Sequence, residues 1–177
     1  MSQSTAILIV LIGAPGTGKT YLGTRLAEWL GATLVQTDAI RKRRFPHPVY
    51  SRLESARVYA EAHRKIEACL RARRTVVFDA TNLRDSYRRT LYRIAERAGA
   101  ELRLLWLWSP EPVIASRLHR RQVAPDPGDL SDATWSIYRQ LISTAEPPTC
   151  EFVVLNGAAP VEDVLRVLTR VLGLRLA

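Results

Sequence analysis

Short apolar runs alternate with amphipathic stretches along most of the 177 residues. The runs are continuously apolar, which is typical of parallel strands covered on both faces. The stretches between them repeat apolar residues at steps of three and four, as helices with one buried face do. The predicted strands are Ala6–Ile12, Thr33–Gln36, Thr75–Phe78, Leu102–Trp108 and Phe152–Leu155. The predicted helices are Lys19–Leu30, Val49–Leu70, Asp85–Ala98, Pro110–Arg121, Asp132–Ala145 and Val161–Leu172. This alternation predicts an α/β fold with a parallel sheet, as a single domain over residues 1–177.

The second predicted helix carries a clear apolar stripe. Its buried face is predicted to contain Val49, Leu53, Ala56, Ala60, His63, Ile66 and Leu70. These positions follow one another at steps of three and four, so they share one side of a helix.

Composition narrows the class of protein. An apolar fraction of 47% excludes a wholly disordered chain. No apolar run approaches the roughly 18 residues of a membrane span. The early run Ala6–Ile12 is short and lacks a basic flank, so we expect a buried strand there and no cleaved signal peptide. Cys69 and Cys150 show no metal-binding spacing, which predicts neither a disulfide framework nor a zinc site and favours a cytoplasmic location.

The segment Gly13-Ala14-Pro15-Gly16-Thr17-Gly18-Lys19-Thr20 matches the phosphate-binding pattern GxxxxGK[ST] at every fixed position. Glycines let backbone N–H groups converge on phosphate oxygens, and the following helix adds its N-terminal dipole. Lys19 is expected to bridge the β- and γ-phosphates, and the Thr20 hydroxyl to ligate Mg²⁺. We assign these residues and Tyr21 to the nucleotide site. No guanine-reading Asn/Thr-Lys-x-Asp motif surrounds any lysine, so ATP is the expected nucleotide.

Two aspartates stand at the ends of predicted strands, where ligands of parallel sheets bind. Asp79 closes the third strand and is predicted to orient Mg²⁺, with a turn cap as the alternative. Asp38 follows the second strand and precedes a helix, so capping competes with a role as general base for an acceptor hydroxyl. Arg41, one helical turn later, is expected to face the same site.

The segments Thr37-Asp38-Ala39-Ile40-Arg41 and Asp79-Ala80-Thr81-Asn82-Leu83-Arg84 resemble those of P-loop kinases of the polynucleotide-kinase and zeta-toxin neighbourhood. More narrowly, they are similar to small bacterial kinases classed with the AAA-type ATPases. The resemblance runs from the phosphate-binding loop to Glu146-Pro147-Pro148. It implies a three-layer P-loop NTPase sandwich with strand order 2-3-1-4-5.

The same resemblance implies roles for individual residues. The first aspartate of the family pattern, here Asp38, acts on the acceptor hydroxyl. The arginine of the DxxR element, here Arg41, contacts the reacting groups. Asp79, Thr81 and Asn82 match the strand-end segment, and Arg84 is a candidate contact to the acceptor.

A helical lid is predicted at about residues 117–135. Arg117 and Arg121 lie four residues apart and share one helix face. The tract from Ala124 to Asp132 then breaks the helix, and Ser131 or Asp132 is expected to cap the next one. We expect Arg121, or Arg120 in its place, to neutralise the transferred phosphoryl group, and Arg117 to stack on adenine. The alternative is a solvated basic helix end.

These features favour an ATP- and Mg²⁺-dependent kinase that moves the γ-phosphate to a hydroxyl of a nucleic-acid 5′ end or of a small molecule. A nucleoside-monophosphate kinase is a second hypothesis. It is disfavoured because Arg84 stands five residues after Asp79, whereas those enzymes place an arginine four residues on. A third is a non-kinase ATPase or nucleotide-dependent switch, which hydrolyses ATP without transfer.

The net charge of +9 is concentrated in one third of the chain. Residues 39–97 hold 16 Lys and Arg against 6 Asp and Glu, which favours an acidic acceptor, with a nucleic-acid end as first candidate. Arg43, Arg44, Arg88 and Arg89 are predicted to extend that surface. The alternative is a compositional bias, because the chain has 23 arginines and only 3 lysines.

Overall fold

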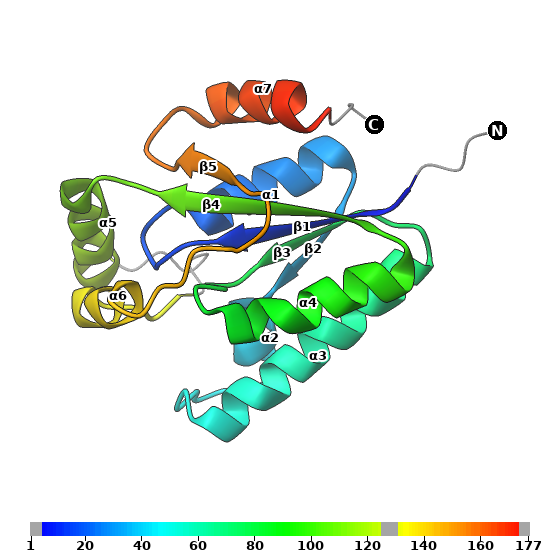
Figure 1. Cartoon of the computed structure of the whole chain (residues 1–177). Helices are drawn as coiled ribbons and strands as arrows, with labels where there is room; N and C mark the ends of the chain where they lie inside the picture. The colour runs from blue at the N-terminus through cyan, green and yellow to red at the C-terminus, as the bar shows by residue number, and fades with distance from the viewer. Residues whose placement is uncertain (1–4, 125–130, 174–177) are drawn as a thin grey trace.

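The protein is described by a computed structural model that covers residues 5–124 and 131–173. Five parallel strands form one sheet in the order β2-β3-β1-β4-β5, which confirms the predicted topology (Figure 1). The strands are β1 (Ile7–Ile12), β2 (Thr33–Gln36), β3 (Val76–Asp79), β4 (Glu101–Trp108) and β5 (Val153–Asn156). The helices are α1 (Lys19–Leu30), α2 (Thr37–Arg44), α3 (Arg52–Arg71), α4 (Asp85–Ala98), α5 (Glu111–Val123), α6 (Trp135–Ile142) and α7 (Val161–Leu172).

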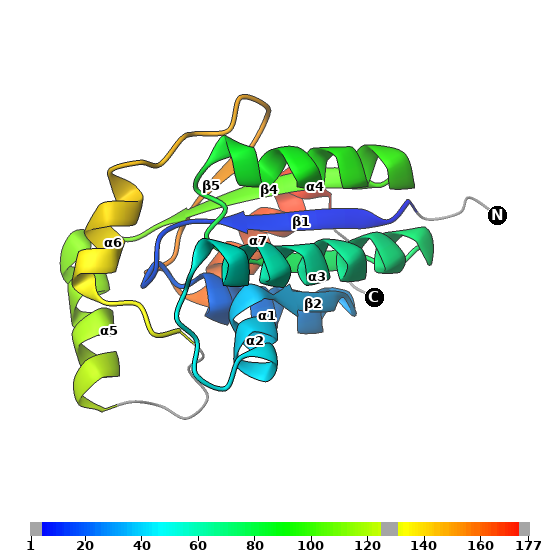
Figure 2. The same ribbon diagram turned by 90° about the horizontal axis from the view of Figure 1, so that it is seen from below.

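Helices cover both faces of the sheet because every central strand is apolar on both sides. Along β1, Leu8 and Val10 belong to the core shared with α3 and α4. Ile9 and Leu11 alternate with them and belong to the core shared with α1 and α7. Figures 1 and 2 show the two helical layers, with α3 and α4 side by side on one of them. The result is the three-layer sandwich that the continuous apolar runs predict.

The predicted buried stripe of α3 is wrong in its first half. Val49 and Leu53 are 77% and 65% exposed, and α3 begins only at Arg52, with Ser51 as its N-cap. The residues that α3 buries are Glu54, Val58, Ala62, Ile66, Cys69 and Leu70. Apolar periodicity does not include a glutamate, although Glu54 is buried. The pattern therefore predicted the wrong buried face for the first turns of α3.

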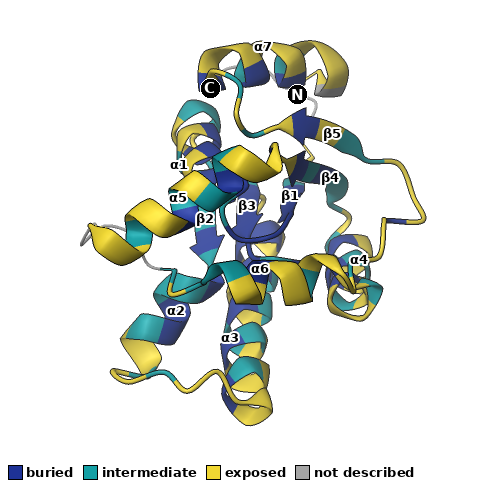
Figure 3. Ribbon diagram, turned by 90° about the vertical axis from the view of Figure 1, so that its left-hand side faces the viewer, coloured by how far each residue is buried: buried dark blue, intermediate teal, exposed yellow. Residues whose placement is uncertain are grey.

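The segment predicted as a lid, residues 117–135, holds the second half of α5 and ends at the first residue of α6. Residues 125–130, the centre of that prediction, lie outside the described residues. The N-cap of α6 is Thr134, whose hydroxyl accepts a hydrogen bond from the Ile137 N–H, so the predicted cap at Ser131 or Asp132 is wrong. Both helices stand at the carboxyl edge of the sheet (Figure 3).

Within residues 5–124 and 131–173, no helix is both long and apolar enough to cross a membrane.

Candidate functional site

Residues 13–18 form the turn between β1 and α1. Gly16 and Gly18 have φ angles of 82° and 97°, in the left-handed region that strains any residue with a Cβ atom. Gly18 is the N-cap of α1 and offers no side chain to it. The first N–H groups of α1 therefore point out of the helix without a side-chain cap, as anion binding requires.

Lys19 folds back over this turn. Its ammonium group donates a hydrogen bond to the Ala14 carbonyl over 2.8 Å, and its side chain is buried. Burial lowers the pKa of Lys19, while the negative charges of Asp79 and Asp38 oppose that shift. The lysine thus stands between the loop that would hold phosphates and two carboxylates.

Asp79, at the end of β3, accepts hydrogen bonds from side chains of two other elements, α1 and β2. The Thr20 hydroxyl donates to Asp79 Oδ2 over 2.8 Å, and the Gln36 amide donates to the same oxygen over 3.2 Å. A hydroxyl and a carboxylate oxygen in contact are hard ligands of the kind that Mg²⁺ prefers, with phosphate and water completing its shell. The side chains of Thr20 and Asp79 therefore fit the predicted metal.

Asp38 lies inside the first turn of α2 and does not cap it. The helix begins at Thr37, its N-cap is Gln36, and no side-chain cap bond is made. Burial raises the pKa of Asp38, and the charge of Asp79 adds to that rise, while Lys19 and Arg41 oppose it. The capping alternative is thus wrong, and the carboxylate stands near both Lys19 and Asp79.

Arg41 is buried in an ion pair. Its guanidinium contacts the Glu54 carboxylate, and the two side chains are 7% and 5% exposed. The Tyr50 ring lies 4.6 Å from the guanidinium carbon, while the second Glu54 oxygen accepts the Val49 N–H over 2.9 Å. Arg41 therefore fastens α2 to α3 in addition to lying near Asp38.

The other predicted acceptor residues have different surroundings. The Thr81 carbonyl accepts the Gly13 N–H over 3.0 Å, which ties the β3–α4 loop to the start of the phosphate-binding turn. Asn82 is fully buried and donates to the Leu11 carbonyl over 2.8 Å, so it belongs to the scaffold of the site. Arg84 is exposed at the N-cap of α4. Contact of these three residues with an acceptor stays a prediction.

Arg117 on α5 reaches the phosphate-binding turn. Its guanidinium donates to the Gly16 carbonyl over 3.1 Å and to the Gly157 carbonyl over 2.9 Å. It thereby links the turn to the loop that follows β5. Stacking of Arg117 on adenine stays a prediction.

Arg121 and Arg120 differ in their burial and in their effect on Lys19. The Arg121 charge acts on Lys19 and lowers the pKa of that lysine, and its side chain is half-buried whereas Arg120 is exposed. Both observations favour Arg121 over Arg120, and contact of either arginine with a transferred phosphoryl group stays a prediction.

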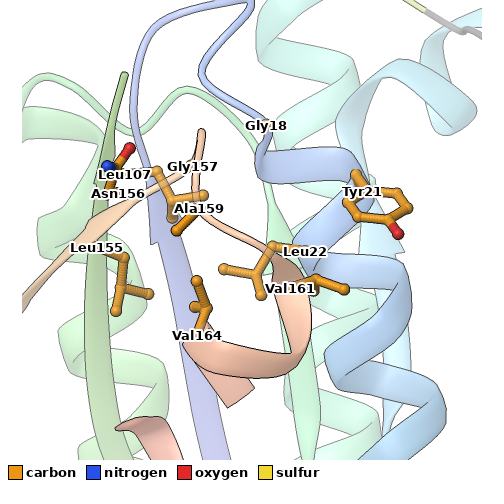
Figure 4. Close-up of a pocket in the computed structure, with 10 residues that line it drawn as sticks. All are labelled: Gly18, Tyr21, Leu22, Leu107, Leu155, Asn156, Gly157, Ala159, Val161 and Val164. Carbon is orange, nitrogen blue, oxygen red and sulfur yellow. The ribbon is translucent and has the colours of Figure 1, made fainter. Parts of the chain in front are cut away.

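A small pocket opens on the other side of that turn. It is lined by residues of α1, β4, β5 and α7, with Gly18 and Tyr21 on one side and Asn156 and Gly157 on the other (Figure 4). Leu22, Leu107 and Val161 make its wall apolar.

Sequence reasoning missed several residues of this region. Glu54 and Gln36 are polar residues of elements that were recognised by their apolar residues. No role was therefore predicted for either. Gly157 approaches the Thr17 carbonyl so closely that a Cβ atom there would lie 1.8 Å from it. The only signal for Gly157 was a glycine directly after the last strand.

Residues 8–148 match a family model described as an AAA domain. The chain belongs to this AAA domain family. The match covers the phosphate-binding turn, both aspartates, α5 and α6.

Curated proteins give partial matches to this AAA domain, and two are described here. An uncharacterized protein of Mycobacterium tuberculosis is 32% identical over 93 residues, which are 46% of this chain. The chain spans only 19% of the length of that relative. A shikimate kinase of Thermobifida fusca is 56% identical over 42 residues, or 24% of each chain.

Solved structures share the fold over most of the chain. Kti12 of Chaetomium thermophilum, in complex with ADP-AlF3, gives a TM-score of 0.76 at 18% identity and covers 96% of this chain and 99% of its own. A gluconokinase from Sinorhizobium meliloti gives 0.60 at 28% identity, with 89% and 86% covered. This AAA domain therefore has the P-loop kinase fold.

Proposed function

We propose that this AAA domain is an ATP- and Mg²⁺-dependent kinase that transfers the γ-phosphate to an acceptor hydroxyl. The observation that carries the proposal is the position of Asp38. It is near Lys19 and Asp79 and makes no cap for its own helix. A carboxylate with a raised pKa is a better proton acceptor than one in water, because its basicity is closer to the working pH.

In the proposed reaction, the acceptor oxygen attacks the γ-phosphorus. The new oxygen–phosphorus bond forms as the bond between that phosphorus and the β–γ bridging oxygen breaks, and ADP leaves. The acceptor proton passes to Asp38. Because the transition state is loose, positioning and charge neutralisation lower most of the barrier.

The remaining residues bind and orient the reactants. The turn 13–18 and the N-terminus of α1 would hold the phosphates, with Lys19 on the β- and γ-phosphates and Arg121 on the transferred group. Thr20 and Asp79 would hold Mg²⁺, which when bound would supply charge neutralisation for the phosphates. The base would lie near Tyr21 and Gly157, beside Arg117.

Several similarities support a kinase. The solved gluconokinase and the shikimate kinase are named for the transfer of phosphate to small hydroxyl compounds. The likeness of residues 37–41 and 79–84 to polynucleotide and zeta-toxin kinases adds the DxxR element and the strand-end aspartate. A nucleoside-monophosphate kinase lacks support in the spacing of Arg84, and a switch ATPase gives Asp38 no role.

The decisive test is Asp38→Asn. The change removes the proton acceptor while keeping nearly the same shape. We expect phosphate transfer to fall about 10²- to 10⁴-fold, with ATP affinity near that of the wild type. Transfer is measured with γ-labelled ATP and a panel of hydroxyl compounds, and affinity by titration of a fluorescent ATP analogue.

Lys19→Ala is the matched comparison because it should weaken ATP binding itself. Intact transfer in Asp38→Asn would remove the base from the mechanism. ATP turnover that no added hydroxyl compound alters would favour the hydrolytic switch instead.

A further inference from the structure

Arg41 and Arg88 are both buried, yet their surroundings differ. Arg88 is 0% exposed, so its predicted place on the basic surface is wrong. Each of its three nitrogen atoms donates a hydrogen bond, to the Tyr92 hydroxyl and to the Asn82 and Glu146 carbonyls. The protein itself therefore provides a partner for every nitrogen of this guanidinium, as the packing of a scaffold residue requires.

The guanidinium of Arg41 leaves one of its nitrogen atoms without a partner. Its Nη1 donates to the Glu54 carboxylate, and its Nη2 lies 3.5 Å from the Ser55 hydroxyl. Its Nε–H is buried and meets no hydrogen-bond acceptor among the described residues. A buried donor without a partner destabilises a protein, and an oxygen atom of a bound reactant would satisfy it. Asp38 lies one turn earlier on α2, and the charge of Arg41 opposes the rise in the pKa of Asp38 that burial causes.

Glu54 is itself held in place by several contacts. One of its carboxylate oxygens contacts Arg41, and the other accepts the Val49 N–H over 2.9 Å. The Glu54 N–H donates to the hydroxyl of Ser51, which caps α3. Desolvation acts to raise the pKa of Glu54, but the hydrogen bonds from Arg41 and from the Val49 N–H lower it overall. The carboxylate is therefore ionised and fixed, and it fixes the guanidinium that it contacts.

Tyr50 covers one face of the same guanidinium. Its ring centroid lies 4.6 Å from the guanidinium carbon of Arg41, and its hydroxyl donates to Asp132 over 2.6 Å. The residue has a φ angle of 54°, in the left-handed region that is strained for a tyrosine. Backbone strain of this kind persists where the surrounding structure imposes one conformation, and it concentrates at functional sites. The connection between α2 and α3 thus holds Arg41 by its edge and by its face.

We propose that Glu54 is a positioning residue of the transfer reaction, which holds Arg41 so that its Nε–H donates to an oxygen atom of the reactants. This inference rests on the proposed kinase function and on the role that the family resemblance implies for Arg41. Glu54 touches no reactant and acts only through Arg41. A buried ion pair often stabilises a protein no more than apolar side chains of similar volume would. What this pair provides is a fixed direction for the guanidinium.

The test is a double-mutant cycle of Glu54→Gln and Arg41→Met. Transfer is measured with γ-labelled ATP, Mg²⁺ and a panel of glycerol, glucose, inositol, a nucleoside and a short 5′-hydroxyl oligonucleotide. Kinetic constants are taken for the compound that the wild type phosphorylates best. We expect Glu54→Gln to lower kcat about 10- to 100-fold, while the KM for ATP stays near that of the wild type. Arg41→Met should lower kcat at least as much, and the double variant no further, because Glu54 acts through Arg41.

Glu61→Gln is the matched control. Glu61 also joins α3 to the last turn of α2, but its partners are Arg43 and Arg44. We expect its kcat to stay near that of the wild type. Glu54→Asp is a second variant of the pair, because it keeps the buried charge while shortening the side chain that holds Arg41. We expect it to fold, as circular dichroism would show, and to lower kcat as well.

The possible outcomes separate the two proposals. Wild-type kcat in folded Glu54→Gln or Glu54→Asp would overturn the positioning role and leave the kinase function standing. An equal fall in Glu61→Gln, or a double variant whose loss is the product of the two single losses, would do the same. A wild type that hydrolyses ATP and transfers phosphate to no compound of the panel would contradict the kinase function, and the inference with it.

Discussion

Asp38 stands where two electrostatic effects oppose each other. A carboxylate in the first turn of a helix is normally stabilised by the helix dipole. Burial and the nearby Asp79 nevertheless raise the pKa of Asp38. The ionised form is therefore less stable in the folded protein than in water, which is the expected condition of a group kept for proton transfer.

This balance predicts how Asp38→Asn changes stability. The folded-state pKa of Asp38 is raised above the unfolded value, so at neutral pH the ionised carboxylate lowers the stability of the folded protein. Asparagine has no charge to desolvate. We expect the variant to melt at a higher temperature than the wild type at about pH 7–8, and the difference to shrink as pH falls through the raised pKa towards 3.8.

Thermal unfolding without nucleotide across this pH range is the measurement. Asp163→Asn, at an exposed aspartate of α7, is the control and should show no such pH-dependent gain. A lower melting temperature for Asp38→Asn at neutral pH would mean that the carboxylate stabilises the fold, as a structural residue would.

At the scale of elements, Arg88 joins three segments around the start of α4. Its guanidinium donates to the Asn82 carbonyl over 2.7 Å and to the Glu146 carbonyl over 2.8 Å. The Glu146 carboxylate accepts the Asp85 N–H over 2.7 Å, and the Glu146 N–H donates to the Leu83 carbonyl. The chain that leaves α6 is thereby attached to the β3–α4 loop, which itself contacts β1 through Asn82.

Arg88 and Arg89 are neighbours in sequence and make a matched pair of substitutions. Arg88→Ala leaves buried carbonyls without donors and creates a cavity. We expect it to lower the free energy of unfolding by about 3–5 kcal/mol. Arg89→Ala removes one exposed ion pair with Asp85 and should cost less than about 1 kcal/mol. Urea unfolding followed by circular dichroism measures both, and equal losses would contradict the assigned role of Arg88.

At the scale of the whole molecule, Gly157 brings the far edge of the sheet against the phosphate-binding turn. Its N–H donates to the Trp108 carbonyl over 2.8 Å, and its carbonyl accepts from Arg117. A Cβ atom at this position would lie 1.8 Å from the Thr17 carbonyl oxygen. Strand β5 and the turn after β1 can approach this closely only with glycine there.

Gly157→Ala should therefore displace the turn that holds phosphate. A shift of that size is expected to weaken ATP binding about 10- to 100-fold. Gly99→Ala is the control, because its Cβ atom would meet nothing within 4 Å, and its positive φ angle should cost only about 1 kcal/mol of stability. Isothermal titration with an ATP analogue distinguishes the two. Wild-type affinity in Gly157→Ala would show that the contact is not needed for nucleotide binding.

The sequence alone determined the fold class and the boundaries of most elements, and it predicted the nucleotide end of the site. Short, continuously apolar runs are typical of strands covered on both faces. The pattern GxxxxGK[ST] predicted roles for Lys19 and Thr20, and the end of the third apolar run predicted one for Asp79. The strand order came from family resemblance, and the structure confirmed it.

The tertiary structure decided which charged side chains are exposed to solvent. Arg41 and Arg88 are equivalent to surface arginines in any count of composition, yet burial against Glu54 and against backbone carbonyls removes both from solvent. The buried face of α3 was also misplaced, because Glu54 is buried but polar, and an apolar pattern does not include it. Ion pairs join residues far apart in sequence, and their energy depends on burial and distance, neither of which local patterns contain. The surroundings of Asp38 and Arg41 therefore follow from packing, whereas the turn at residues 13–18 follows from sequence.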